Sequence, residues 1–570
     1  MRRVKDNISV FENSTKRLTE LGNKRRAGGD VVGAVSAYRN ALESSPFDYE
    51  ANAGLAELYT SVSDAYDTTD LLPEAINCWF RALSVAESDY EKARAYNGLG
   101  ANYFFLSKDI FAIHYFNEQL RVDPDNFYEY NDVIEDVQDA ALDREYEAAT
   151  SHFGYTLAYD KNSDEDGEKA LAQARTLTES GKLNEALLLL TQIKEDSPHF
   201  LKALQGIAFI LLLQEKFDTA VEISEHILYL DADNFRAQYV LCSAYKNLGK
   251  QKESDELFEK LCRRKANDRE FNFQMLMLAL ETERESGALL FADRIVNETP
   301  YDLNVLYVRG LIKYNLGDVD GCIADLKKVL IFTDNPVVKN KLAEAREKKE
   351  NSQPLGKMSY DFNLEEEEVK FRIEELNRRF QDMQSAGIIS FDDIVEHCDC
   401  IIKCRFTDLL PIGIHMGLAL NAKKMHEYLR VVLLDSTVAD ELKRCILKEY
   451  LSLGINMPIR CVAGHIYKSF NVQPVKLSGY AAEAFQEAYA VAASNLYLID
   501  QHKIILLRRR IVKYREKYEQ NLGPEDVKPD ILAAGIFKML ALPILSEDKV
   551  VCEMFSVKQE DLENIIQYLK

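Results

Sequence analysis

The sequence predicts an all-α protein in which helical hairpins stack into a superhelical solenoid, followed by a helical C-terminal region. Glycine and proline are scarce, with 25 and 13 among 570 residues, and this scarcity favours helices over turn-rich β structure. Apolar residues recur at the spacing of an amphipathic helix over most of the chain. A set of small and aromatic residues also recurs every 34 residues, which indicates an array of repeats.

The charge of the chain limits the partners that it can attract. The formal net charge is −23, so most of the surface should repel nucleic acid and anionic membranes. No stretch approaches the roughly 20 apolar residues of a membrane span, and the N-terminus lacks the apolar core of a signal peptide. The ten cysteines follow no disulfide-framework spacing, which indicates reduced thiols. We therefore expect a cytoplasmic protein that does not contact membranes and uses no cofactor.

The clearest hairpin is YNGLGANYFFLSKDIFAIHYFNEQLRVDPDN, which begins at Tyr96. Its marker residues are, in order, Tyr96, Leu99, Gly100, Tyr103, Ala112, Phe116 and Pro124. Small residues let two antiparallel helices approach closely, and the aromatic side chains fill the space between neighbouring hairpins. This order resembles the tetratricopeptide repeat, although Tyr96 replaces the usual tryptophan and Gln119 replaces a small residue.

The same order recurs before and after this hairpin and gives about eight repeats across residues 15–336. The earlier two repeats carry Leu21, Gly22, Ala34, Tyr38, Ala41 and Pro46, then Leu55, Ala56, Tyr59, Ala75, Trp79 and Ala82. Extra residues in the second repeat, SVSDAYDTTDLLPE, either lengthen both helices or form a protruding loop. Later repeats keep the 34-residue phase at their small-residue position, occupied by Ala186, Ala220, Ser254, Ala288 and Cys322.

These patterns divide the chain into seven parts. We expect an N-terminal tail at 1–14, a first array of three repeats at 15–126, an acidic helical connection at 127–166, a second array of five repeats with a capping helix at 167–350, and a linker at 351–363. The remaining parts are an α-helical region at 364–490, which loosely resembles HEAT-type helical pairs, and a C-terminal helical module at 491–570.

The C-terminal module weakly resembles a helix-turn-helix or the last helices of a cyclin-type fold. Side chains suited to nucleic-acid contact are Arg508, Arg509, Arg510, Lys513, Lys558 and Gln559. However, Glu560, Asp561 and Glu563 open the helix that would enter the groove, and a DNA-reading helix should present basic or amide side chains there. We therefore expect a structural module that could also join two copies of the chain, and we do not expect nucleic acid as the partner.

The stretch VEHCDCIIKC, residues 395–404, concentrates one histidine and three cysteines. On a helical wheel Cys398 falls on the apolar stripe and is a core residue. His397, Cys400 and Cys404 fall together on one flank of the same helix. A metal site is therefore conceivable only on that flank.

Zinc would need a fourth ligand, which Cys461 or His465 could supply. The short ligand turns that are typical of zinc modules are absent, so we expect no metal site. A redox-active thiol would need a depressed pKa, and the neighbouring Glu396 and Asp399 oppose that shift. We expect these cysteines to pack between helices.

The tetratricopeptide resemblance implies that the first helices of successive hairpins line a concave groove that holds a partner peptide. The side chains expected to face this groove are Asn23, Arg26, Arg94, Asn97 and Phe104. Some members grip chaperone carboxylates with a clamp of basic and asparagine residues. Here Thr19, Gly54 and Gly98 stand where members of the clamp are expected, so that activity is not predicted.

The sequence thus predicts a non-enzymatic scaffold or adaptor that binds a partner protein or peptide in the groove of its repeats. It contains no glycine-rich phosphate loop, nucleophile elbow or H-E-x-x-H motif. The alternative is a regulatory protein in which the arrays sense a partner and the C-terminal module binds nucleic acid.

Overall fold

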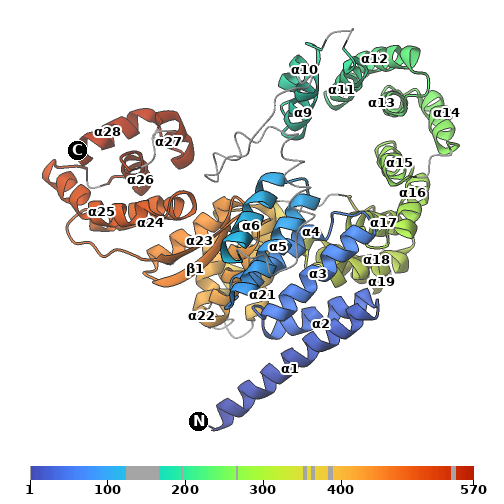
Figure 1. The fold of residues 1–570 in the computed structure, drawn as a ribbon. Coiled ribbons are helices and arrows are strands. Elements are labelled where there is room, and N and C mark those ends of the chain that lie inside the picture. The colour runs from blue at the N-terminus through green and yellow to red at the C-terminus, as the bar shows by residue number, and fades with distance from the viewer. Residues whose placement is uncertain are drawn as a thin grey trace. The chain divides into compact units, whose positions relative to one another are not determined.

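Helices make up most of the chain, as the repeat pattern predicts (Figure 1). The computed structural model describes residues 2–123, 166–193, 197–264, 268–350, 356–360, 366–382, 389–524, 526–540 and 547–570. The chain divides into two compact units. Unit 1 is Met1–Gly154, Leu330–Lys341 and Asp361–Lys570, and unit 2 is Tyr155–Val329 and Leu342–Tyr360. The expected acidic connection at 127–166 lies almost wholly outside the described residues.

Three helical hairpins form the first array. They pair α1 (Arg2–Ala27) with α2 (Val31–Ser44), α3 (Tyr49–Ala65) with α4 (Leu72–Leu83), and α5 (Asp89–Phe105) with α6 (Asp109–Val122). Because α1 begins at Arg2, its backbone is helical through the segment expected to be a tail. Asp30, Asp48 and Ser88 cap α2, α3 and α5, and each side chain accepts a hydrogen bond from a backbone N–H of the first turn.

Five further hairpins and a final helix form the second array. The hairpins are α9 (Asp166–Glu179) with α10 (Leu183–Leu190), α11 (Phe200–Leu213) with α12 (Phe217–Leu230), α13 (Phe235–Asn247) with α14 (Gln251–Cys262), α15 (Arg269–Glu281) with α16 (Glu285–Glu298), and α17 (Leu303–Asn315) with α18 (Val319–Phe332). The final helix is α19 (Pro336–Glu350). Within unit 2, α11, α13 and α15 lie on the inner side of an arc and α12, α14 and α16 on its outer side (Figure 1).

The turn inside each hairpin of the second array contains one residue with a left-handed backbone. These residues are Gly181 (φ 74°), Glu215 (φ 58°), Gly249 (φ 75°), Glu283 (φ 59°) and Gly317 (φ 92°), each 34 residues after the last. Glycine adopts this conformation without steric cost, whereas a side chain makes it unfavourable. The regular recurrence confirms that the repeat phase predicted from the sequence holds through the array.

The extra residues of the second repeat lengthen one helix and widen one turn. The helix α3 continues to Ala65, and α4 begins only at Leu72. Asp67, with φ 48°, takes the left-handed position of this longer turn. The insertion therefore does not lengthen both helices, and α4 keeps an ordinary length of 12 residues.

The C-terminal third folds around a single core that runs from Ile373 to Leu569. Its helices are α20 (Glu366–Gln381), α21 (Phe391–Cys404), α22 (Leu410–Leu434), α23 (Asp440–Ser452), α24 (Ala482–Ile499), α25 (Lys503–Gln520), α26 (Pro529–Lys538), α27 (Asp548–Phe555) and α28 (Gln559–Leu569). The last two helices are joined by a short turn, as expected, and Ser556 has a left-handed backbone there. Ser546, the expected cap of α27, lies outside the described residues.

The expectation that residues 364–490 are wholly helical is wrong. An antiparallel hairpin, β1 (Met457–Ala463) with β2 (Ile466–Val472), interrupts the helices. Gly464 and His465 form its two-residue turn, and both have positive φ, as a tight hairpin turn requires. The two strands contain β-branched and aromatic residues, which favour a strand over a short helix here.

The left-handed turns yield a first prediction. Replacing Glu215 by glycine should raise the free energy of unfolding by about 0.5–1 kcal/mol, because the strain of a side chain at φ 58° is removed. Urea unfolding, with hydrogen exchange in α11 and α12 to localise the effect, measures this change. The matched control is Glu222→Gly at an exposed position of α12, which should lower the free energy of unfolding by about 1 kcal/mol. A loss of stability in Glu215→Gly would contradict the account.

Candidate functional site

Two of the five expected groove residues of the first array belong to an ion-pair network. Arg26 Nη1 lies 2.5 Å from Glu57 Oε2, and Arg94 Nη2 lies 2.6 Å from Glu57 Oε1. Arg94 also lies 3.2 Å from Glu50. Although burial disfavours a charged Arg94, Glu57 and Glu50 outweigh this effect and raise the pKa of Arg94. These arginines are thus neutralised within the array, which lessens their availability to a carboxylate ligand.

The other three expected groove residues have different surroundings. Asn23 is exposed and accepts a hydrogen bond from the Tyr38 hydroxyl at 2.5 Å. Phe104 is half-buried beside the exposed Phe105 ring. Asn97 is half-buried, and its side-chain nitrogen finds no hydrogen-bond partner within the described part of the chain. The structure therefore brings Arg26 and Arg94 together through Glu57, and among the described residues no hydrogen bond or ion pair joins all five into one site.

Packing explains why the carboxylate clamp is incomplete. Gly54 and Gly98 occupy positions where the clamp requires asparagine and a basic residue. A side chain at Gly54 would overlap the Tyr38 ring, and one at Gly98 would overlap Trp79. Each aromatic ring comes from the second helix of the preceding hairpin and is almost fully buried. These glycines are therefore needed for hairpin stacking, and a longer side chain would have no room.

The helices on the inner side of the second array carry four exposed apolar side chains, called the inner wall below, that the sequence analysis did not single out. Phe209 and Leu213 on α11 and Phe273 and Met277 on α15 are each between 39% and 47% exposed. Phe209 and Met277 occupy the same position of two repeats, 68 residues apart. The 34-residue phase was the signal that could have related Phe209 to Met277, because each lies 11 residues before the small residue of its repeat, Ala220 or Ala288.

Two polar side chains of α13, the helix between the two apolar pairs, are hydrogen-bonded to the same carboxylate. Tyr239 and Ser243 on α13 both donate hydrogen bonds to Glu281 on α15, at 2.8 Å and 2.6 Å. Burial, with Glu281, raises the pKa of Tyr239, so its hydroxyl stays protonated and can donate. The shared carboxylate holds α13 against α15 and so fixes the position of these two helices relative to each other.

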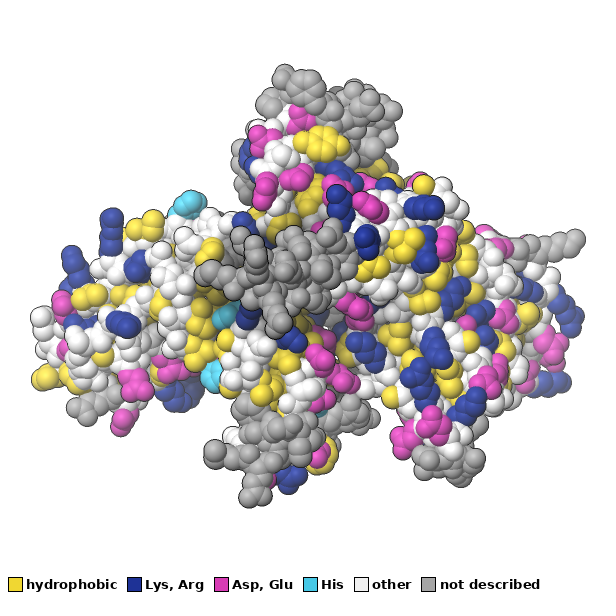
Figure 2. All heavy atoms as spheres, turned by 90° about the horizontal axis from the view of Figure 1, so that it is seen from below, with side chains coloured by type: hydrophobic (Ala, Val, Ile, Leu, Met, Phe, Trp, Pro, Cys, Tyr) yellow, Lys and Arg dark blue, Asp and Glu magenta, His cyan; other side chains and the backbone are white. Residues whose placement is uncertain are grey.

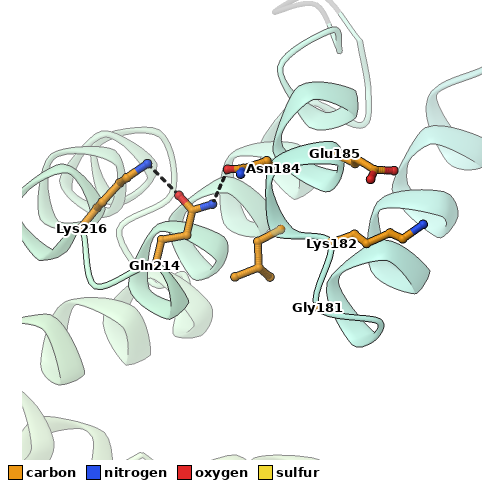
Figure 3. Close-up of a pocket in the computed structure, with 7 residues that line it drawn as sticks. Gly181, Lys182, Asn184, Glu185, Gln214 and Lys216 are labelled. Carbon is orange, nitrogen blue, oxygen red and sulfur yellow. Dashed lines mark hydrogen bonds between the residues drawn. The ribbon is translucent and has the colours of Figure 1, made fainter.

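An open pocket lies at the hairpin turns of the same array (Figure 3). It holds about 470 Å³ and is lined by Gly181, Lys182, Leu183, Asn184, Glu185, Gln214 and Lys216. Gln214 donates to Asn184 at 3.0 Å and accepts from Lys216 at 2.8 Å. These bonds join neighbouring turns and satisfy the side chains, so the pocket is explained by the stacking of hairpins.

The C-terminal third packs against the first array within unit 1, where α22 contacts α4. The turn of the β-hairpin makes several of these contacts. The Tyr115 hydroxyl donates to the His465 carbonyl at 2.6 Å, and the Tyr103 hydroxyl lies 3.1 Å from His465 Nδ1. Lys108 Nζ lies 3.2 Å from Nε2 of the same ring. His465 is therefore held by the third repeat and is not available as a ligand for the cysteine cluster.

A second contact between these parts involves Asn77 of α4. Its side chain donates to Asp435 at 2.9 Å and accepts from the backbone N–H of Ser436 at 2.8 Å. Arg430 adds a hydrogen bond to Ser84 and lies 3.7 Å from the centre of the Phe47 ring. These polar contacts fix the C-terminal third on the second helices and loops of the first array.

The cysteine-rich helix α21 packs into the core of the C-terminal third. Cys398 is buried in the C-terminal core, as predicted, but Cys400 is buried there too, at 6% exposure. This burial agrees with the expectation that the cysteines pack between helices, because both α20 and α22 contact α21. His397 Nδ1 lies 2.6 Å from the Asp393 carbonyl of its own helix.

The chemistry of these thiols follows from their burial. Burial raises the pKa of Cys398 well above that of an ordinary thiol, and raises that of Cys461 to about 12. Such thiols are poor nucleophiles at neutral pH. Burial also raises the pKa of Asp399 to about 6, and Tyr428 donates to its carboxylate at 2.7 Å. In the part of the chain that the structure describes, no three His, Cys, Asp or Glu side chains are grouped to hold a metal ion.

The candidates for nucleic-acid contact lie on two helices. Arg508, Arg509, Arg510 and Lys513 are exposed on α25, whereas Lys558 and Gln559 are at the start of α28. The contacts between α25 and α28 join the ends of the two helices, through Lys517 with the Lys570 carbonyl and Asn521 with the Tyr568 carbonyl. None of the expected basic side chains takes part in these contacts. No described helix combines the length and apolar character needed to cross a membrane.

Comparison with known families adds an independent observation. Residues 235–268, which contain α13 and α14, match the family model described as tetratricopeptide repeat. The chain therefore contains a tetratricopeptide repeat. The match confirms the resemblance inferred from the sequence, at a repeat whose individual residues match the pattern only weakly. The chain is an all-α, superhelical repeat protein followed by a helical C-terminal region.

Solved structures of tetratricopeptide proteins align with the chain at low similarity. A tetratricopeptide repeat protein from Parabacteroides merdae ATCC 43184 is 17% identical, with 59% of this chain and 99% of that chain covered and a TM-score of 0.28. The APC/C hetero-tetramer Cut9–Hcn1 is 16% identical, with 78% of this chain and 95% of that chain covered and a TM-score of 0.26. Yeast Tom70 is 14% identical, with 97% of each chain covered and a TM-score of 0.20. No curated protein sequence matches the chain significantly.

The contacts of His465 yield a prediction for the dependence of stability on pH. Burial, with Lys108 and Lys443, lowers the pKa of His465 from 6.5 to about 4. The unfolded chain therefore binds this proton more readily than the folded chain. The contribution to stability is present above pH 6.5 and is lost as the pH falls from 6.5 towards 4.

Replacing His465 by asparagine, which tolerates a left-handed backbone, should remove this loss. Chemical unfolding of the full chain at pH 7 and at pH 4.5 measures it. We expect stability to fall less with acid in His465→Asn than in the unmodified chain. The control His226→Asn, at an exposed position of α12, should leave the dependence on pH unchanged. Equal acid sensitivity of His465→Asn and the unmodified chain would refute this role.

Proposed function

We propose that this chain is a non-enzymatic scaffold that binds a partner protein along the inner wall of its second array. The observation that carries the proposal is the pair of exposed apolar patches on α11 and α15, made of Phe209 with Leu213 and Phe273 with Met277. Most large apolar side chains in a folded protein are covered, and exposed ones that gather on one face favour contact with another molecule.

The composition of the wall supports a protein as the ligand. Aromatic residues and methionine are enriched where proteins bind one another, because they bury much area at little loss of side-chain entropy. Covering this wall would gain about 25 cal/mol for each Å² of apolar surface removed from water. The polar strip of Tyr239, Ser243 and Glu281 between the patches is already hydrogen-bonded, so it gives the wall a fixed shape.

The inner wall of the first array is less suited to gripping a ligand. Its basic groups, Arg26 and Arg94, would have to leave Glu57 before they could bind a new carboxylate. Breaking such a part-buried pair leaves a charge without its partner, which is costly. The first array supports the C-terminal third through contacts of α4, α5 and α6, and the second array is the proposed binding surface.

The test is quantitative affinity capture with the full chain and its variants. Phe209→Ala combined with Phe273→Ala should lower recovery of the partner at least about tenfold, because aromatic anchors contribute most of the affinity at protein interfaces. Both side chains are more than a third exposed, so their truncation should change thermal stability little.

The matched control is Tyr229→Ala, which removes an aromatic ring that is 87% exposed on the outer helix α12. Recovery of the partner should be unchanged in this control. Arg94→Glu with Asn97→Ala tests the first array in the same assay, and we expect recovery to be maintained. If recovery falls with the first-array variant and not with the second-array variant, the site is in the wrong array. Equal recovery of the partner by all the variants would contradict the proposal.

A further inference from the structure

The exposed face of α25 carries positive charge that the rest of the fold leaves without an acidic partner. Arg508, Arg509, Arg510 and Lys513 are all exposed. Among the described residues, none of the four forms an ion pair, and only the Arg508 side chain makes a hydrogen bond, to Gln473. The same chain has a net charge of −23, and its other arginines are commonly paired with carboxylates. A free basic face of this kind is therefore a local exception.

Apolar side chains lie within the basic face. Ile505 is 62% exposed and Val512 is 39% exposed. Ile505, Arg509 and Val512 follow one another at four- and three-residue spacing, so they adjoin on one side of the helix. A helix face that contacts only water normally carries polar side chains, so two exposed aliphatic side chains of this size favour a further contact. Figure 2 shows dark-blue basic and yellow apolar side chains interspersed at the left of the view, where the C-terminal helices lie.

The fold itself does not require this face. The opposite side of α25, with Ile504, Leu507, Ile511, Tyr514 and Tyr518, is buried in the C-terminal core. The exposed side can therefore be changed without opening that core. Its residues are free to serve an interaction.

From this geometry we infer that the exposed face of α25 binds an acidic, amphipathic protein segment. Carboxylates of the segment pair with Arg508, Arg509 and Lys513, and its apolar side chains cover Ile505 and Val512. Charge complementarity favours such a ligand, because an acidic segment is repelled by most of this chain and attracted to this face. The site is distinct from the inner wall of the second array and does not depend on the function proposed for it.

Nucleic acid fits the same face less well. Phosphates would pair with the basic groups but would leave Ile505 and Val512 exposed to water. The basic candidates on α28 do not extend the face, because the contacts between α25 and α28 are at Lys517 and Asn521.

The test uses the full chain and three fluorescent probes in titrations from about 0.05 to 0.5 M salt. The first probe is a peptide of about 15 residues with leucines at helical spacing among glutamates. The second is poly-glutamate of the same length, and the third is duplex DNA of about 20 base pairs. We expect the amphipathic peptide to bind at least about tenfold more tightly than either other probe.

Variants of α25 separate the two parts of the site. Arg509→Glu should weaken peptide binding at least about tenfold at low salt, and Ile505→Ser should weaken it at high salt, where the charges are screened. The matched control Lys260→Glu reverses an exposed charge on α14 and should leave binding unchanged. Thermal unfolding of each variant verifies that the core is intact.

Three results would overturn the inference. One is binding of poly-glutamate as tight as that of the amphipathic peptide, which would make the face a simple charge patch. Another is preferential binding of duplex DNA, which would make it a nucleic-acid surface. The third is absence of peptide binding at low salt, or equal loss in Lys260→Glu and Arg509→Glu, which would leave α25 as a solvated helix.

Discussion

The left-handed residue at the turn of each hairpin is the constraint on which the repeat architecture depends. It reverses the chain within a few residues, so that the second helix of each hairpin begins at the same point of every repeat in the second array. Where this position is glycine, the turn forms without strain; Glu215 and Glu283 adopt it against their preference. Because each hairpin contacts mainly its neighbours, a constant turn produces a regular stack. The inner wall of the second array follows from that regularity.

Stacking also determines which chemistry the array can offer. In the first array, the Tyr38 and Trp79 rings fill the space beside Gly54 and Gly98, and carboxylates neutralise the remaining arginines. The same array also contacts the β-hairpin and the loop at Asp435. In the second array the inner positions carry aromatic and thioether side chains instead. One repeat pattern therefore yields a supporting array and an apolar wall, depending on a few positions that the pattern leaves free.

Periodic features of the molecule could be predicted from the sequence, and contacts between distant segments could not. The 34-residue recurrence of Ala186, Ala220 and Ser254 located the hairpins, because hairpin packing requires small residues there. It did not reveal that Arg26 and Arg94 share Glu57, since that contact joins three repeats. The short strands β1 and β2 were missed because the surrounding pattern is helical.

The most direct test of the central claim is site-specific photo-crosslinking in the full chain. A photoreactive phenylalanine analogue replaces Phe273 on the inner helix α15 in one sample and Tyr229 on the outer helix α12 in another. Both positions are aromatic, and Tyr229, at 87% exposure, is more accessible than Phe273, at 39%, so exposure alone would favour crosslinking from position 229. The account predicts a crosslinked partner protein from position 273 and none from position 229. Crosslinking from position 229 alone, or equally from both, would contradict it.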